Sequence, residues 1–164
     1  MVEFYPWWVY LHVLGAFTFA AAHGTSAIVS FRIRSARGAD EVRLLLNVSQ
    51  IAVGVMYVGL LLLLIGGIVA GIVGDHFGRG WIWASLALLV VVMVAMYMLA
   101  TPFYKRLRDA VGAEVADPRI DDPVTTVPAN ELDALVRSNR PVLLTVVGLG
   151  GFVVILWLML LKPF

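Results

Sequence analysis

Three histidines are the residues in this sequence whose type and spacing best suit chemistry. His12 and His23 lie in the apolar stretch 7–31, and His76 lies in a short polar stretch further along. Eleven helical residues place His12 and His23 about 16 Å apart along one face, with about 20° between them around the axis. Ionisable residues inside a membrane are costly and commonly functional. The alternative is that each neutral imidazole bonds a hydroxyl or carbonyl on a neighbouring helix.

Imidazole and thioether groups together suit haem iron or soft copper. Methionines predicted at the depth of His23 are Met56, Met93 and Met96. A haem held by His12 and His76 requires the polar stretch to fold inward. We therefore predict haem b ligands among His12, His23 and His76. Copper ligands are predicted among His12, His23, Met56, Met93 and Met96. Methionine is also ordinary filler in apolar cores, so this pattern favours a site without establishing one.

The sequence lacks the residues or motifs that several other kinds of functional site require. The chain has no cysteine, which excludes disulfides, thiolate metal sites and quinone-coupled disulfide-forming enzymes. No Asp or Glu lies in the apolar runs, and no phosphate-cradling loop or zinc-binding HExxH motif occurs. The arginines near the first apolar run fit membrane topology and anionic-lipid contact better than nucleic-acid binding.

The elements that must position the histidines are membrane-spanning helices. Hydrophobic residues make up 61% of the 164 residues and charged residues 14%, too few charges for the surface of a soluble domain. Apolar runs over 7–31, 44–74, 81–100 and 141–161 each reach the roughly 20 residues that cross a bilayer. We therefore predict a single membrane domain over 1–164, an all-α four-helix transmembrane bundle. Residues 101–140 form a cytoplasmic loop with short helices, of which the first continues the third span.

The distribution of basic residues predicts the orientation. Ten of the twelve Lys and Arg residues flank the inner sides of these spans, and only Arg79 and Lys162 lie on the other side. Cytoplasmic loops carry the Lys/Arg excess, so both termini are predicted outside (N-out/C-out). The five tryptophans fall in the outer parts of their spans and agree with this orientation. The expected location is the bacterial cytoplasmic (inner) membrane, as a multi-pass protein.

Glycines in the second and fourth spans predict close helix packing. Gly67 and Gly71 form a GxxxG pair, which commonly lets two membrane helices approach each other. A second interpretation is that some glycines leave space for a flat cofactor. The tight turn at 75–80 predicts that the second and third spans are antiparallel neighbours.

The first apolar run resembles a known group of sequences. Its letters are WWVYLHVLGAFTFAAAHGTSAIVSFRIR, and the later segments LNVSQIAVGVMYVGLLLLLIGGIVAG and LWLMLLKPF extend the likeness over most of the chain. They resemble an uncharacterised family of small four-helix bacterial integral membrane proteins. The segment LHVLGA is more loosely similar to copper-resistance D-type membrane domains, which implies copper handling, with His12 as the matching residue. Membrane b-type cytochromes also place a histidine in such a helix.

Three functions follow from these observations. The first is a small redox-associated protein that binds haem b through histidines of the first span, alone or as a subunit of a larger complex. The second is a copper-handling or transport accessory using His and Met, and the third is a cofactor-free structural subunit. An electron-transfer or accessory role is favoured over a stand-alone enzyme. Expected partners are the lipid bilayer and other membrane subunits or a second copy, and not nucleic acid.

Overall fold

A computed structural model describes residues 2–112 and 129–164, and the middle of the predicted loop, 113–128, lies outside them. Four helices are long and apolar enough to cross a membrane. They are α1 (Tyr5–Ile33), α2 (Ala39–Val73), α3 (Gly80–Ala110) and α5 (Arg140–Leu161). A short 3-10 turn (Val2–Phe4) precedes α1, and α4 (Ala129–Val136) precedes α5. The described chain contains no strand, so the predicted all-α four-helix membrane bundle is confirmed.

Two of the helices extend well beyond the predicted spans. Helix α2 begins at Ala39, with Asp40 and Glu41 in its first turn, where carboxylates stabilise the positive end of the helix dipole. Helix α3 continues past Pro102 to Ala110 as an amphipathic extension that places Phe103 and Leu107 in the core. Both extensions occur at the same end of the bundle.

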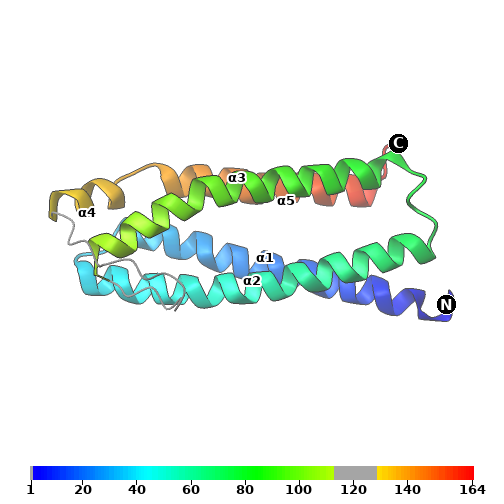
Figure 1. Ribbon diagram of the computed structural model, residues 1–164, viewed down its shortest axis with the longest axis horizontal. Helices are drawn as coiled ribbons and strands as arrows, with labels where there is room; N and C mark the ends of the chain where they lie inside the picture. The colour runs from blue at the N-terminus through cyan, green and yellow to red at the C-terminus, as the bar shows by residue number, and fades with distance from the viewer. Residues whose placement is uncertain (1, 113–128) are drawn as a thin grey trace.

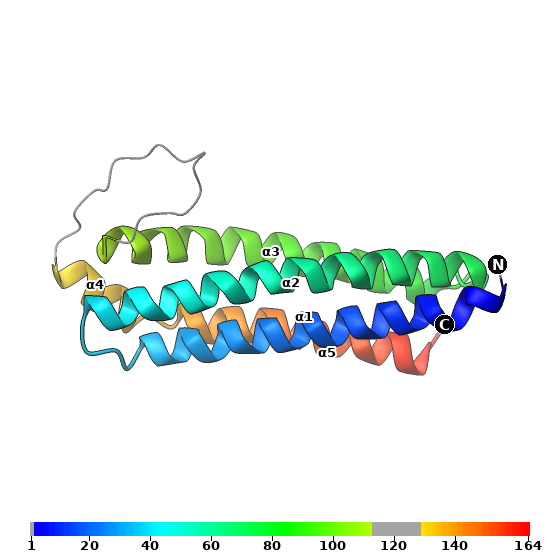
Figure 2. The same ribbon diagram turned by 90° about the horizontal axis from the view of Figure 1, so that it is seen from below.

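The bundle is built from two helix pairs. Helix α1 packs along α2, and α3 packs along α5, while the two pairs meet mainly through α1 and α5. Figure 1 shows α3 and α5 running together above α1 and α2, and Figure 2 gives the same bundle from below. Helices α2 and α3 are antiparallel, as expected for a short turn. They also meet in the core of the basic residues' end of the bundle, where Leu46 of α2 and Leu107 of α3 belong to one cluster, although each helix packs chiefly against another partner.

The α1–α2 interface is a contact between backbones. A Cβ atom added to Gly15 would lie 2.3 Å from the Leu63 nitrogen, and one on Gly59 would lie 2.6 Å from the Phe19 nitrogen. One on Gly66 would lie 2.6 Å from the His12 nitrogen. Membrane helices gain little from hydrophobic association and pack through small residues instead. The absence of these three side chains therefore permits the close approach.

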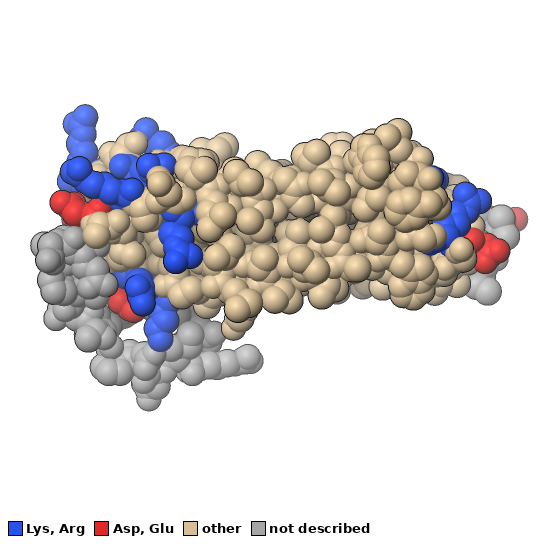
Figure 3. Space-filling view, turned by 90° about the horizontal axis from the view of Figure 1, so that it is seen from above, with Lys and Arg blue, Asp and Glu red and all other residues tan. Residues whose placement is uncertain are grey.

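The basic residues gather at the end of the bundle that holds the α1–α2 turn and the start of α5, here called the basic end (Figure 3). Its members among the described residues are Arg32, Arg34, Arg37, Arg43, Lys105, Arg106, Arg108, Arg137 and Arg140. A hydrophobic core that includes Ile33, Leu46 and Leu107 packs the helices together at this end. Arg43 donates to the carbonyl of Val111 at 2.6 Å, which ties α2 to the end of α3.

Candidate functional site

His12 bridges α1 and α2 through its ring. Its Nδ1 lies 2.8 Å from the carbonyl oxygen of Leu63. A carbonyl only accepts, so Nδ1 donates in this bond. The ring lies over Gly67, where a Cβ would come within 2.6 Å of Nδ1. Gly67 of the GxxxG pair therefore makes room for an imidazole, and the helix backbones approach at neighbouring glycines.

His23 lies between α1 and α5 and is 8% exposed. Its Nε2 is buried and has no hydrogen-bond partner in the described part of the chain. The nitrogen faces Gly148, whose Cβ, if it had one, would lie 2.3 Å away. The imidazole stacks on Phe19 at 5.9 Å, and Phe19 stacks on Phe152 of α5 at 6.2 Å. A nitrogen without a partner among the described residues thus lies in an aromatic and apolar environment at the junction of the two helix pairs.

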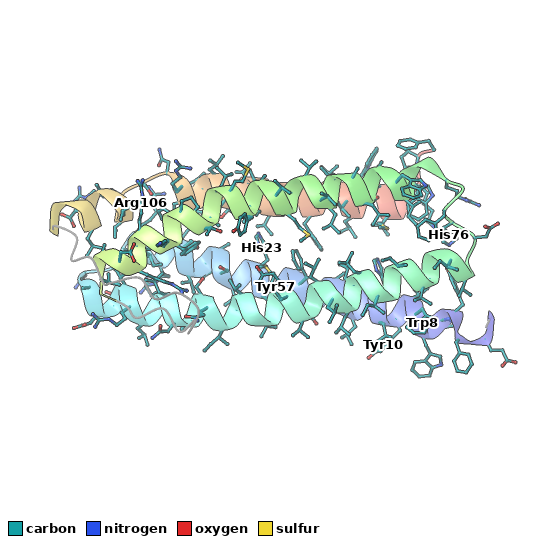
Figure 4. All side chains as sticks on the ribbon, in the orientation of Figure 1. Trp8, Tyr10, His23, Tyr57, His76 and Arg106 are labelled. Atoms are coloured by element: carbon teal, nitrogen blue, oxygen red, sulfur yellow. The ribbon has the colours of Figure 1, made fainter. Side chains whose placement is uncertain are left out.

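His76 lies in the turn after α2, at the end opposite to the basic end (Figure 4). Its Nε2 is 3.3 Å from the Tyr5 hydroxyl, and its Nδ1 is buried without a partner among the described residues. Trp81 lies beside the ring at 5.9 Å, and the Lys162 ammonium is 5.5 Å from the centre of the Trp81 ring. This cluster joins the start of α1, the α2–α3 turn and the chain end.

The three histidines occupy separate levels. His12 lies over Gly67 of α2, and His76 lies against Gly74, the residue that follows α2. The two glycines are seven residues apart, or about 10 Å along the helix axis. His23 lies deeper, over Gly148 of another helix (Figure 4). The structure therefore does not bring any two of the histidines together as opposite ligands of one iron.

The methionines of the predicted copper site are spread over different surroundings. Met93 is 41% exposed, Met56 is half-buried, and Met96 packs against the core of the basic end. Within the described residues, no group of three or more His, Asp or Glu side chains is placed to hold a metal ion.

A shared feature that sequence reasoning missed is the glycine beside each imidazole. Gly67, Gly148 and Gly74 each lie where a Cβ would collide with a histidine ring, of His12, His23 and His76 respectively. Counting residues by depth places Gly67 level with His12. To predict that Gly148 lies beside His23, one must know that α1 packs against α5, and the residue spacing within either helix does not show this.

The four long apolar helices define a small multi-pass integral membrane protein. The family described as "Predicted integral membrane protein (DUF2269)" matches residues 7–163, and the chain belongs to this family. The expected likeness to an uncharacterised membrane family is thereby confirmed. Nothing among the curated proteins or among the solved structures matches the chain.

Proposed function

We propose that this protein is a redox-associated membrane subunit that binds haem b, with His23 as a ligand to the iron. The observation that carries the proposal is the buried Nε2 of His23, which lacks a partner among the described residues. Buried polar atoms are nearly always satisfied, so an orphaned one calls for an explanation, and an absent ligand is one such explanation. His12, on which the sequence pattern placed most weight, has no such buried unpartnered nitrogen, and its Nδ1 is bonded to Leu63.

The surroundings of His23 are flat and apolar, as haem requires. Gly148 lets the ring of His23 lie directly against α5, so haem at Nε2 would require α1 and α5 to separate, and Phe19 and Phe152 would supply apolar walls. The site lies where the two helix pairs meet, which is the junction that can part with the least loss of packing. Bound haem would supply one-electron transfer.

A cofactor-free structural subunit is the competing function. The bond from His12 to Leu63 favours it, because Nδ1 of that imidazole joins two helices without any cofactor. On this hypothesis, the histidines and their glycines are packing devices, and His23 remains a neutral core residue.

The visible spectrum of detergent-purified protein, made with haem precursor and copper supplied, separates these functions. A ligand role predicts a Soret band that His23→Gln abolishes and His23→Met retains in shifted form, since thioether can ligate haem iron. His12→Gln is the matched control and should leave the band in place. Bound copper without haem would support the copper-handling alternative. A parent protein that carries neither would reject the haem proposal in favour of the structural subunit.

A further inference from the structure

A groove of about 220 Å³ opens at the basic end between α3 and the turn that joins α4 to α5. Its walls differ in character along its length. Leu99, Pro102 and Phe103 of α3, with Leu135 of α4, form the apolar part. Arg106, Ser138 and Arg140 form the polar part. An amphipathic ligand with a polar head and an apolar tail would match this division.

The polar part carries positive charge that is not neutralised within the described chain. Arg106 and Arg140 both have exposed side chains and both line the groove. In residues 2–112 and 129–164, the ion pair found is Arg43 with Asp40, at 2.8 Å, and it involves neither groove arginine. Figure 4 shows Arg106 beside the segment that leads from α4 into α5. The groove is therefore complementary to an anion.

Ser138 supplies an independent indication of a missing acceptor. Its Oγ is buried and has no hydrogen-bond partner in the described residues, although it lines the groove. Helix α5 begins two residues later, and Asn139 makes no side-chain capping bond to it. The first backbone N–H groups of a helix lack intrahelical acceptors and favour anions. A change of rotamer would turn this hydroxyl toward an oxyanion in the groove, beside the N–H groups of this helix end, to which Pro141 contributes none.

The height of the groove fits the edge of a bilayer. Helix α3 starts at Gly80, and roughly 20 residues cover about 30 Å of hydrocarbon, which brings Leu99 to the boundary. Arg106 lies about 10 Å beyond Leu99 along the helix. The apolar wall is thus level with the start of the acyl chains, and the arginines are level with the phosphates.

We propose that this groove binds one anionic phospholipid, with its phosphodiester between Arg106 and Arg140 and its glycerol end near Ser138. The acyl chains leave along Leu99 and Pro102. Basic pockets between helices at a membrane surface are known to take anionic lipid headgroups. The proposal does not depend on any cofactor at His23.

Native mass spectrometry of the purified protein tests this proposal, with phosphatidylglycerol and chain-matched phosphatidylcholine as the probes. The parent should retain one phosphatidylglycerol preferentially. Arg106→Gln and Arg140→Gln should each weaken its retention about five-fold, the loss expected for one basic residue near a phosphate. Ser138→Ala should weaken it less. Arg32→Gln is the matched control, because it removes a charge at the same end but outside the groove.

Thermal melting in detergent without added lipid would show that the variants remain folded. Equal retention of both lipids by the parent, or an equal loss in Arg32→Gln, would overturn the proposal in favour of diffuse surface charge. Displacement of the lipid by millimolar-range inorganic phosphate would instead identify a free-phosphate site, and would overturn the lipid assignment.

Discussion

At the scale of single residues, the bond from His12 to Leu63 joins a side chain of α1 to the backbone of α2. The Leu63 carbonyl already belongs to a helix, so the imidazole uses a second lone pair of that oxygen. Hydrogen bonds between membrane helices contribute modestly, on average about 0.6 kcal/mol, because the separated helices also find partners. The bond therefore positions the ring more than it stabilises the bundle.

His12→Phe tests this contribution, because it keeps a flat ring near Gly67 and removes the donor. We expect a loss of about 1 kcal/mol in the free energy of unfolding, from the bond together with poorer packing of the longer ring. His12→Gln, which retains a donor, should lose less. Unfolding in mixed detergent micelles measures both, and Tyr10→Phe on the exposed surface is the control. If His12→Phe were as stable as Tyr10→Phe, the bond to Leu63 would contribute nothing.

At the scale of elements, α1 and α2 form the most tightly packed unit of the fold. Gly59 and Gly66 are seven residues apart on α2 and each meets a backbone atom of α1. A repeat of seven is the spacing at which helices with a small crossing angle keep the same face in contact. Any side chain at these positions would have to displace a whole helix, because backbone cannot rotate away.

Gly59→Ala and Gly66→Ala should therefore lower the stability of the protein by about 1–3 kcal/mol each, the usual cost of overpacking. Gly54→Ala on the same helix is the matched control, since its Cβ would meet nothing within 4 Å. It should be neutral or slightly stabilising, because Ala favours helix more than Gly does. Thermal melting in detergent compares the three variants. Equal melting of all three would contradict the backbone contact.

The helices could be predicted from the sequence, but their pairing could not. Four apolar runs specify four helices, because a bilayer requires satisfied backbone hydrogen bonds. Which helix lies beside which depends on complementary surfaces. The GxxxG pair Gly67 and Gly71 correctly indicated that α2 packs through glycines. These two glycines, however, make room for the rings of His12 and Phe77 and do not contact the backbone of a neighbouring helix. The sequence also does not reveal that Nε2 of His23 lacks a partner among the described residues, because that nitrogen faces Gly148, which lies on a helix far along the chain.

At the scale of the whole molecule, the charge asymmetry between the two ends sets the orientation expected in the membrane (Figure 3). The α1–α2 turn at the basic end contains the exposed Ser35, and the turn at the other end contains the exposed Gly78. The chain has no cysteine, so a cysteine introduced at either position is a unique label site.

In intact cells, an impermeant thiol reagent should label Gly78→Cys and leave Ser35→Cys unlabelled, because the Lys/Arg excess stays on the cytoplasmic side. Permeabilised cells provide the control, in which both variants should react. Labelling of Ser35→Cys from outside would reverse the predicted orientation. The lipid groove of the basic end would then belong to the outer leaflet.

The division into two helix pairs has a consequence for biosynthesis. Helices α1 and α2 are consecutive, so their glycine interface can form as soon as both have left the translocation machinery. When helix α3 enters the membrane, its chief packing partner does not yet exist, because α5 begins only after residues 111–139 have been synthesised. A nascent chain interrupted before α5 would leave α3 exposed to lipid without its partner and open to membrane quality-control proteases. The α1–α2 pair can therefore assemble during synthesis, whereas the α3–α5 pair can assemble only after α5 has been made.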